Sequence, residues 1–182
     1  AMNRTSKEPA ITAPAPQQIE GVEVFVEGEG KDAIVMVHGW PDTWRLWDDQ
    51  VDYLKRNFRC VRFTLPGFDI AKPKQAHSLD DLVATLKRVI ETTCPNEKVT
   101  LMLHDWGCVF GYQFAMRHPA LVKRIIGVDI GDAGSAAHVS SMSAKAKAMV
   151  FAYQFWLAIA WRIGGGLGDR MTLAMVRAMR CP

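Results

Sequence analysis

Continuous apolar runs alternate with helical patterns along most of the chain. The runs are "AIVMV" (33–37), "RCVRF" (59–63), "KVTLML" (98–103) and "RIIGVDI" (124–130). The stretch "SLDDLVATLKRVIETT" (78–93) begins with a capping box of Ser78 and Asp81, and its apolar residues recur at helical spacing. Strands that are apolar throughout are typical of parallel sheets buried on both faces. The pattern therefore predicts the α/β class, with a mostly parallel sheet and helices on both of its faces.

Further elements surround these runs. "VEVFV" (22–26) alternates apolar and polar positions, and the turn residues "EGEGKD" connect it to the run at 33–37, which predicts a hairpin. Helical spacing predicts two more helices, over 44–56 and 108–118.

The two ends of the chain differ from this core. After Gly134 no strand pattern follows, and helical patterns run from about Ser141 to Ile163 and then, after "GGGLGD", on to Arg180. The beginning of the chain is rich in Ala and Pro and lacks the apolar stretch of a secretory signal. We therefore expect a flexible leader over 1–18, the sheet-containing core over 19–135 and a helical segment over 136–182.

Composition narrows the class of protein. The chain has 182 residues, of which 49% are hydrophobic and 23% charged. This length and composition are sufficient for one buried hydrophobic core. Its formal charge of +3 comes from scattered basic residues and argues against nucleic-acid binding. The most apolar stretch (148–161) contains Gln154 and is shorter than the roughly 20 residues that span a bilayer. We expect no transmembrane segment, and contact with a membrane surface stays open.

The cysteines show neither a CxxC pair nor the spacing of metal ligands. They are Cys60, Cys94, Cys108 and Cys181. We therefore expect reduced thiols in a cytoplasmic protein, with no metal and no cofactor.

Two short motifs follow apolar runs. "HGWP" (38–41) follows the first run, and "HDWG" (104–107) follows the third and directly precedes a helix. In open α/β sheets, ligands bind beyond the carboxyl ends of the strands. A strand, a tight turn and a helix also hold one side chain out over the sheet. Asp105 stands at that turn, and its side chain is open to three interpretations: a nucleophile, a structural carboxylate in an ion pair or at a helix N-terminus, or chance.

These motifs resemble the α/β-hydrolase fold and, within it, the epoxide hydrolase group, which is related to the haloalkane dehalogenases. The matching stretch runs from about Gly21 to Gly131 and holds "HGWPDTWRLWDDQ", "LPGF", "HDWG" and "RHPALVKRIIGVD" in the family's order. It corresponds to the N-terminal portion of the family's fold, followed by the start of its helical cap. The resemblance implies a hydrolase that opens an epoxide, or a similar alkyl electrophile, through an ester that water then cleaves.

The resemblance also implies roles for particular residues. Asp105 is implied as the nucleophile that forms the ester. The backbone N–H groups of Trp40 and Trp106 are implied as the oxyanion hole, and Tyr153 in "FAYQFW" as a cap tyrosine that donates a hydrogen bond to the epoxide oxygen. The other motif residues are expected to orient these turns and border the substrate, and they are His38, Gly39, Pro41 and His104.

The chain also departs from the family's pattern. No residue matches the late water-activating histidine, its usual acid partner or the second cap tyrosine, and Asp129 at a strand end is the runner-up acid. Leu103 stands two places before Asp105, where a small residue is usual. Thr64, Asp69 and Ala71 replace the family's usual Asp, Gly and Ser.

Two other functions are compatible with the same fold. A haloalkane dehalogenase would use the Trp106 indole to hold the halide, but Trp40 stands where such enzymes usually carry Asn or Glu, and Tyr153 has no use there. A truncated, catalytically inactive interaction module is the other alternative. The expected partners are a small-molecule substrate and, because half a sheet leaves an open edge, either a missing C-terminal half or a second copy.

Overall fold

The chain folds as two compact units, residues 1–130 and 131–182. A computed structural model describes residues 14–69, 71–73, 75–130 and 140–179. The expected boundary after residue 135 and the first thirteen residues of the expected leader lie outside the described residues.

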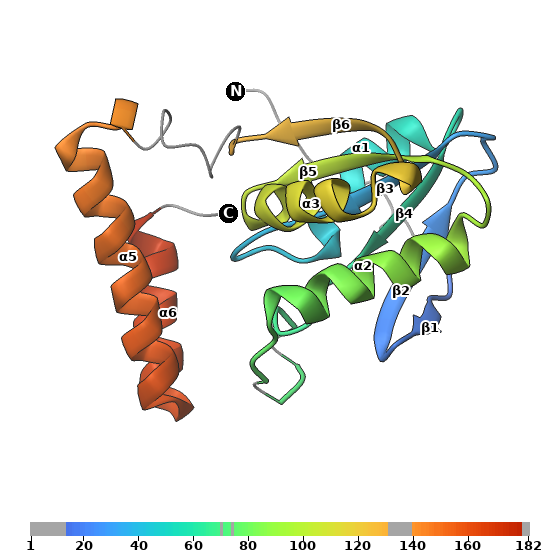
Figure 1. Ribbon diagram of the computed structural model, residues 1–182. Helices are drawn as coiled ribbons and strands as arrows, with labels where there is room; N and C mark the ends of the chain where they lie inside the picture. Colours follow the sequence, from blue (N-terminus) through green and yellow to red (C-terminus); the bar gives the residue numbers. More distant parts are fainter. Residues whose placement is uncertain (1–13, 70, 74, 131–139, 180–182) are drawn as a thin grey trace, which may run out of the picture. The chain divides into compact units, whose positions relative to one another are not determined.

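A six-stranded sheet forms the centre of the first unit (Figure 1). Its strands are β1 (Gln17–Ile19), β2 (Val22–Glu27), β3 (Ala33–Val37), β4 (Arg59–Phe63), β5 (Val99–His104) and β6 (Val122–Val128). They lie in the order β1-β2-β4-β3-β5-β6, with β1 and β2 antiparallel to their neighbours and the other pairs parallel. The predicted mostly parallel sheet is confirmed, and β1 begins within the stretch expected to be a leader.

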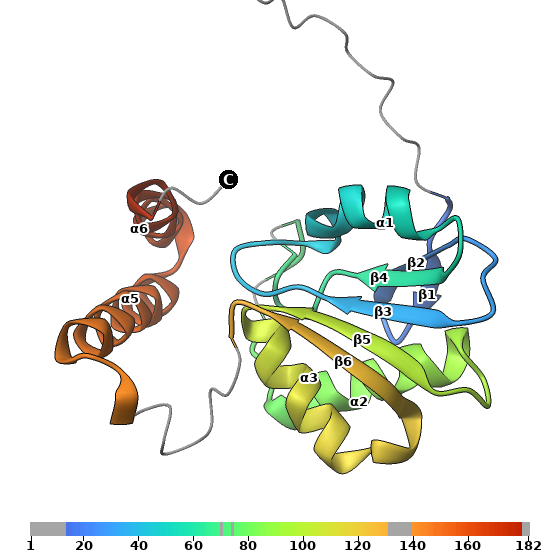
Figure 2. The same cartoon turned by 90° about the horizontal axis from the view of Figure 1, so that it is seen from above.

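Helices cover both faces of this sheet (Figure 2). One face carries η1 (Trp44–Trp47) and α1 (Asp48–Leu54), and the other carries α2 (Leu79–Thr93) and α3 (Trp106–Arg117), which ends before the short η2 (Pro119–Leu121). All five residues of β3 are buried, because Ile34 and Met36 belong to the core under α1 while Val35 and Val37 belong to the core under α2 and α3. The continuous apolar run therefore reflects burial on both faces.

The expected hairpin between 22–26 and 33–37 is wrong. β4 lies between these two strands and pairs with β2 antiparallel and with β3 parallel. The connecting glycines allow a close approach, because a Cβ on Gly28 or Gly30 would run into the backbone between α1 and β4, including the carbonyl oxygens of Phe58 and Asn57. The connection passes close beside this backbone instead of folding back on β2.

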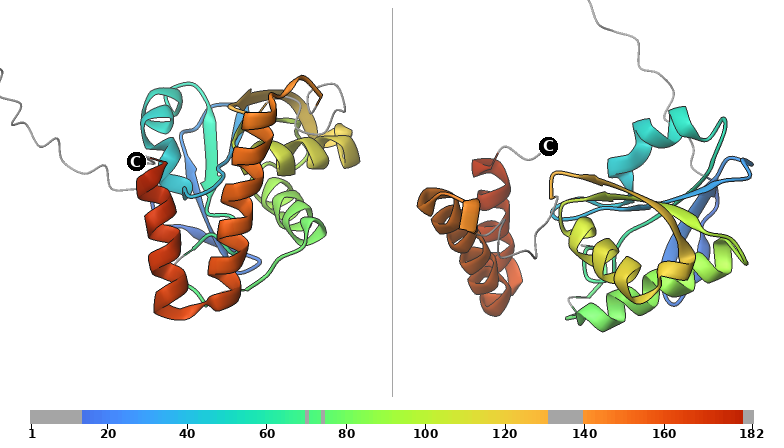
Figure 3. Two further views of the ribbon diagram at one scale, coloured as in Figure 1. Left: turned by 90° about the vertical axis from the view of Figure 1, so that its left-hand side faces the viewer. Right: turned by 45° about the horizontal axis from the view of Figure 1, so that its top comes forward.

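Among the described residues of the second unit, two long helices lie side by side (Figure 3): α5 (Ala144–Ile163) and α6 (Gly165–Ala178). The stretch "GGGLGD", expected between the two helical patterns, is mostly helical, because only Gly164 separates the helices and α6 includes the rest. Gly168, inside α6, allows the two helices to approach closely, because a Cβ there would collide with the carbonyl oxygen of Ala160. Within the described residues, neither these helices nor the others are long and apolar enough to cross a membrane.

Candidate active site

The two sequence motifs lie next to each other at the carboxyl edge of the sheet. β3 and β5 are parallel neighbours, and Val37 pairs with Leu103 in their register. "HGWP" and "HDWG" therefore leave the sheet at the same level. The helix that follows β3 covers one face of the sheet and the helix that follows β5 covers the other, which is the arrangement in which open α/β sheets form their binding crevice.

Asp105 occupies a strained turn between β5 and α3. Its backbone has φ 50° and ψ −126°, and a positive φ is uncommon for a residue other than glycine. The turn is tight because a Cβ on Gly107 would run into the carbonyl oxygen of Val37, and a Cβ on Gly39 would lie 2.5 Å from the nitrogen of Trp106. The half-buried Asp105 side chain is thereby held at the end of the sheet.

The carboxylate of Asp105 accepts a hydrogen bond from the other motif. The backbone N–H of Trp40 donates to Oδ2 of Asp105 over 2.8 Å. The side chain makes no capping bond to its own helix, and no cation of the described residues forms an ion pair with it. The ion-paired interpretation therefore has no contact to support it in the part of the chain that the structure describes. The helix N-terminus interpretation stays open, because Asp105 is the N-cap residue of α3.

Leu103 fits beside the turn because the facing position of α3 is a glycine. Leu103 is fully buried, and a Cβ on Gly111 would lie 2.5 Å from its two terminal methyl carbons. The Leu103 side chain, which is larger than the family's usual residue, therefore fits against Gly111, about one and a half turns from the start of α3.

His38 joins the turn after β3 to the segment after β4. Its ring is fully buried, and its Nε2 accepts a hydrogen bond from the Leu65 N–H over 2.9 Å. The Nδ1 must therefore carry the proton, which it donates to the Gly39 carbonyl over 2.8 Å. Burial lowers the pKa of His38 to about 4, with smaller opposing contributions from the Gly39 carbonyl and Asp105. Neither ring nitrogen is free for a substrate.

Asp42 is a member of the site that we did not single out from the sequence. Burial raises its pKa; the nearby Asp105 charge raises it further and His104 opposes the shift. His104 in turn has a buried Nδ1 without a hydrogen-bond partner among the described residues. Two carboxyl groups and an imidazole therefore share one half-buried region, where an ionised Asp105 favours a protonated Asp42.

A buried arginine anchors the loop that carries Trp40. Arg62 of β4 forms an ion pair with Glu27 of β2 over 2.8 Å and also bonds to Asp48 at the start of α1. Its guanidinium lies 4.5 Å from the ring centre of Trp44, and the backbone N–H of Trp44 donates to Thr64 Oγ1 over 3.3 Å. Thr64, which departs from the family's usual Asp, thus contributes a contact of its own.

The remaining predicted residues are placed as follows. Asp129 directly follows Val128, which pairs with His104, so Asp105 and Asp129 follow neighbouring strands at the same level. The indole of Trp106 stacks on Phe110, with ring centres 6.0 Å apart. Tyr153 belongs to α5 in the second unit, where its hydroxyl accepts a hydrogen bond from Gln154 over 3.5 Å.

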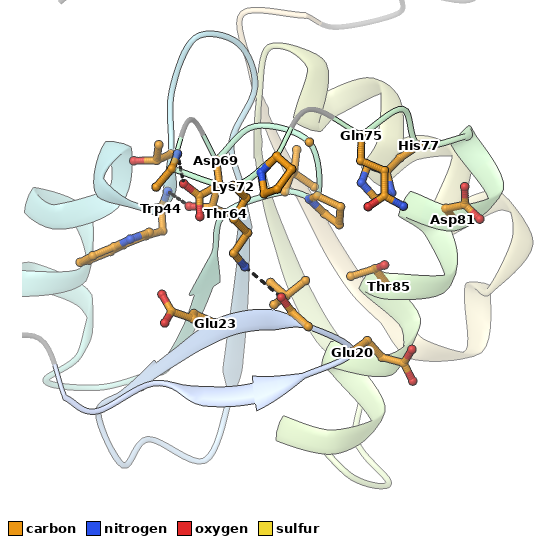
Figure 4. A pocket seen from close by; sticks show the side chains of 18 of the residues that line it. Glu20, Glu23, Trp44, Thr64, Asp69, Lys72, Gln75, His77, Asp81 and Thr85 are labelled. Atoms are coloured by element: carbon orange, nitrogen blue, oxygen red, sulfur yellow. Dashed lines mark hydrogen bonds between the residues drawn. The ribbon is translucent and has the colours of Figure 1, made fainter.

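A cavity of about 1000 Å³ lies elsewhere in the first unit (Figure 4). It is bordered by the β1–β2 turn, residues 43–45, the segment after β4 and α2, and none of the predicted site residues lines it. Lys72 donates to the Gly21 carbonyl over 3.0 Å, and Arg88 pairs with Glu20 over 3.2 Å. Because these charges already have partners and the strained turn lies outside the cavity, we place the candidate active site at Asp105.

The sequence matches the family described as alpha/beta hydrolase fold over residues 32–159, more than half of the chain. The chain therefore belongs to the α/β-hydrolase fold family. Helices on both faces of a mostly parallel sheet and the turn at Asp105 agree with that assignment.

Epoxide hydrolases are among its relatives. The chain is 31% identical over 110 residues to Epoxide hydrolase 1 of Caenorhabditis elegans, a match that covers 59% of this chain and 27% of the relative. The crystal structure of epoxide hydrolase VrEH1 from Vigna radiata superposes with a TM-score of 0.57 at 25% identity, covering 63% of this chain and 39% of that one. The crystal structure of a mutant epoxide hydrolase from Bacillus megaterium, complexed with its product, gives a TM-score of 0.52 at 30% identity, covering 60% of this chain and 40% of that one. The chain thus spans well under half the length of these relatives.

Proposed function

We propose that this chain carries the nucleophilic half of an epoxide hydrolase. The observation that carries the proposal is the 2.8 Å hydrogen bond from the Trp40 N–H to Oδ2 of Asp105. This hydrogen bond occupies Oδ2 of Asp105 and leaves Oδ1 as the oxygen that attacks the epoxide. The named relatives, which are epoxide hydrolases, support the choice of substrate class.

This arrangement supports the following reaction. Oδ1 of Asp105 attacks a ring carbon, the ring C–O bond breaks, and its electron pair stays on the departing oxygen. This oxygen takes a proton from an acid, the role that the family resemblance implies for Tyr153. The product is a hydroxyalkyl ester in which Oδ2 is the carbonyl oxygen. When water adds to this ester, the negative charge develops on Oδ2, where the Trp40 N–H already points and the Trp106 N–H completes the oxyanion hole. Collapse of the intermediate releases the diol and restores the carboxylate.

Activation of that water is the step that the described residues support least. His38 is buried with both ring nitrogens bonded, and its low pKa makes it a poor base. Asp129 follows the strand next to the one that precedes Asp105. We propose its carboxylate as the acid partner of the group that activates this water. We therefore expect this chain by itself to form the ester and to hydrolyse it slowly.

The open edge of β6 supports the proposed need for a partner. Among the described residues no strand pairs with its outer side, and Ile125, Ile126 and Val128 are exposed. The rest of a longer chain or a second copy would complete the sheet there.

The first prediction tests the nucleophile. The chain is incubated with an aromatic epoxide, quenched in acid and analysed by intact mass and peptide mapping. We expect an adduct of the epoxide's mass on the peptide that contains Asp105, and its loss in Asp105→Asn. Asp129→Asn is the matched control, because it also removes a strand-end carboxylate with positive φ and should keep the adduct.

Two outcomes would contradict the proposal. An adduct that persists in Asp105→Asn would exclude Asp105 as the nucleophile. Release of bromide from a bromoalkane, without any reaction of the epoxide, would favour the dehalogenase alternative.

A further inference from the structure

The α5 helix presents a face of aromatic side chains that point away from α6. Phe151 and Phe155 are 69% and 57% exposed, and their rings stack with centres 5.9 Å apart. The contact with α6 is made by the other side of the helix, where Ala160 is buried against Gly168. Phe151 and Ala160 lie about two and a half turns apart, which puts them on opposite sides of α5.

Cations stand at both ends of this aromatic face. Lys147 precedes Phe151 by four residues and Arg162 follows Phe155 by seven, and both spacings keep the charged side chains on the same face. Both residues are exposed. Along the helix axis this face therefore carries a cation, two stacked rings and a second cation. We call these four residues, Lys147, Phe151, Phe155 and Arg162, the outer face of α5.

The surrounding sequence has few acids. After Asp132 the chain has six basic residues and one acid, Asp169. The basic residues are Lys145, Lys147, Arg162, Arg170, Arg177 and Arg180. Exposed phenylalanine side chains bury apolar surface when they enter the boundary of a membrane. Lys and Arg side chains beside them are attracted to anionic headgroups, and their stems are long enough to reach these headgroups.

We propose that the outer face of α5 binds the surface of a membrane that contains anionic lipid. Phe151 and Phe155 enter the boundary between headgroups and acyl chains, and Lys147 and Arg162 contact the negatively charged headgroups. Charge favours this occupant over a second copy of the same face. Two such faces packed against each other would bring Lys147 and Arg162 near cations of the partner, which is repulsive.

Co-sedimentation with vesicles tests this proposal. We expect the chain to sediment with vesicles of phosphatidylcholine and phosphatidylserine, to stay largely in solution with phosphatidylcholine alone, and to bind less as salt is raised. Lys147→Gln and Arg162→Gln should each lower the partition coefficient about fivefold. Phe151→Ser combined with Phe155→Ser should lower it by more than about tenfold.

Matched controls come from the first unit. Lys31→Gln with Arg56→Gln removes two exposed cations, and Tyr53→Ser removes an aromatic side chain that is 73% exposed. Both should bind vesicles like the parent chain, and all variants should keep the parent's circular dichroism spectrum. Equal binding to both vesicle types, or undiminished binding by the phenylalanine variant, would overturn the proposal. So would a change in oligomeric mass on Phe151→Ser and Phe155→Ser without vesicle binding, because the occupant would then be a second copy.

Discussion

The pKa of His38 makes the stability of the first unit depend on pH. Because burial lowers this pKa to about 4 from its usual 6.5, the unfolded chain binds a proton between these values while the folded chain does not. The stability that this group contributes is complete above about pH 6.5 and is lost as the pH falls toward 4. We expect the free energy of unfolding to fall on the order of 1 kcal/mol for each pH unit in this window. Urea unfolding at several pH values measures it.

Variants separate His38 from other groups that titrate in the same range. His38→Asn should lower stability at neutral pH by about 2 kcal/mol, because it leaves the Leu65 N–H or the Gly39 carbonyl poorly bonded, and it should flatten the pH dependence. His77→Ala, on the segment after β4, should leave the pH dependence as it is. A pH dependence unchanged by His38→Asn would show that another residue causes it.

The sequence predicted where the two motif turns of the site lie, but it did not predict which charged side chains lie near them. The positions of "HGWP" and "HDWG" follow from two runs that are parallel neighbours, so the sequence motifs and the geometry point to the same place. The proximity of Asp42 and the Arg62 ion pair do not follow from any local pattern. They depend on which strands become neighbours and on how deeply the loop after β3 is buried, and both are set by the whole fold.

At the scale of elements, α3 and β5 depend on one complementary pair. Leu103 fills the space that Gly111 leaves, so Gly111→Ala should force a shift and cost about 1–3 kcal/mol. Leu103→Ala alone should cost about 2–5 kcal/mol by opening a cavity. In the double variant the added methyl meets empty space, and the combined cost should be clearly less than the sum of the two single costs. Chemical unfolding of the four proteins measures the coupling, and additive costs would show that the two residues do not share this space.

Elements were easier to predict than their pairing. β3 and β4 have the limits that their apolar runs indicated, and α2 starts with the expected capping box, in which Ser78 and Asp81 bond to each other's backbone N–H. The expected hairpin was wrong because alternating positions and turn residues predict where a strand lies and where it ends. Which strand pairs with it depends on contacts between residues that are distant in the sequence. α6 begins earlier than expected, and Gly168 inside it allows a close contact with Ala160 instead of forming a turn.

At the scale of the whole molecule, β6 is the open edge of the described sheet. Ile126 and Val128 point to one face and Ile125 to the other, since successive strand side chains alternate, and all three are exposed. Exposed apolar edge strands pair readily with other chains. In the family's relatives much more chain is present, whereas this chain spans 27% of one and 39% of another. We therefore expect any association of this chain to depend on this edge.

We expect the 182-residue chain to self-associate through β6. Its weight-average mass, measured by light scattering or sedimentation over a range of concentrations, should rise with concentration. Ile126→Lys with Val128→Lys should lower the mass toward that of the monomer, because a charged edge strand cannot pair without burying its ammonium groups. Tyr53→Lys, which puts a cation on the exposed surface of α1, should leave the association unchanged. A parent chain that stays monomeric at every concentration would contradict pairing through β6, and so would association that survives the double substitution.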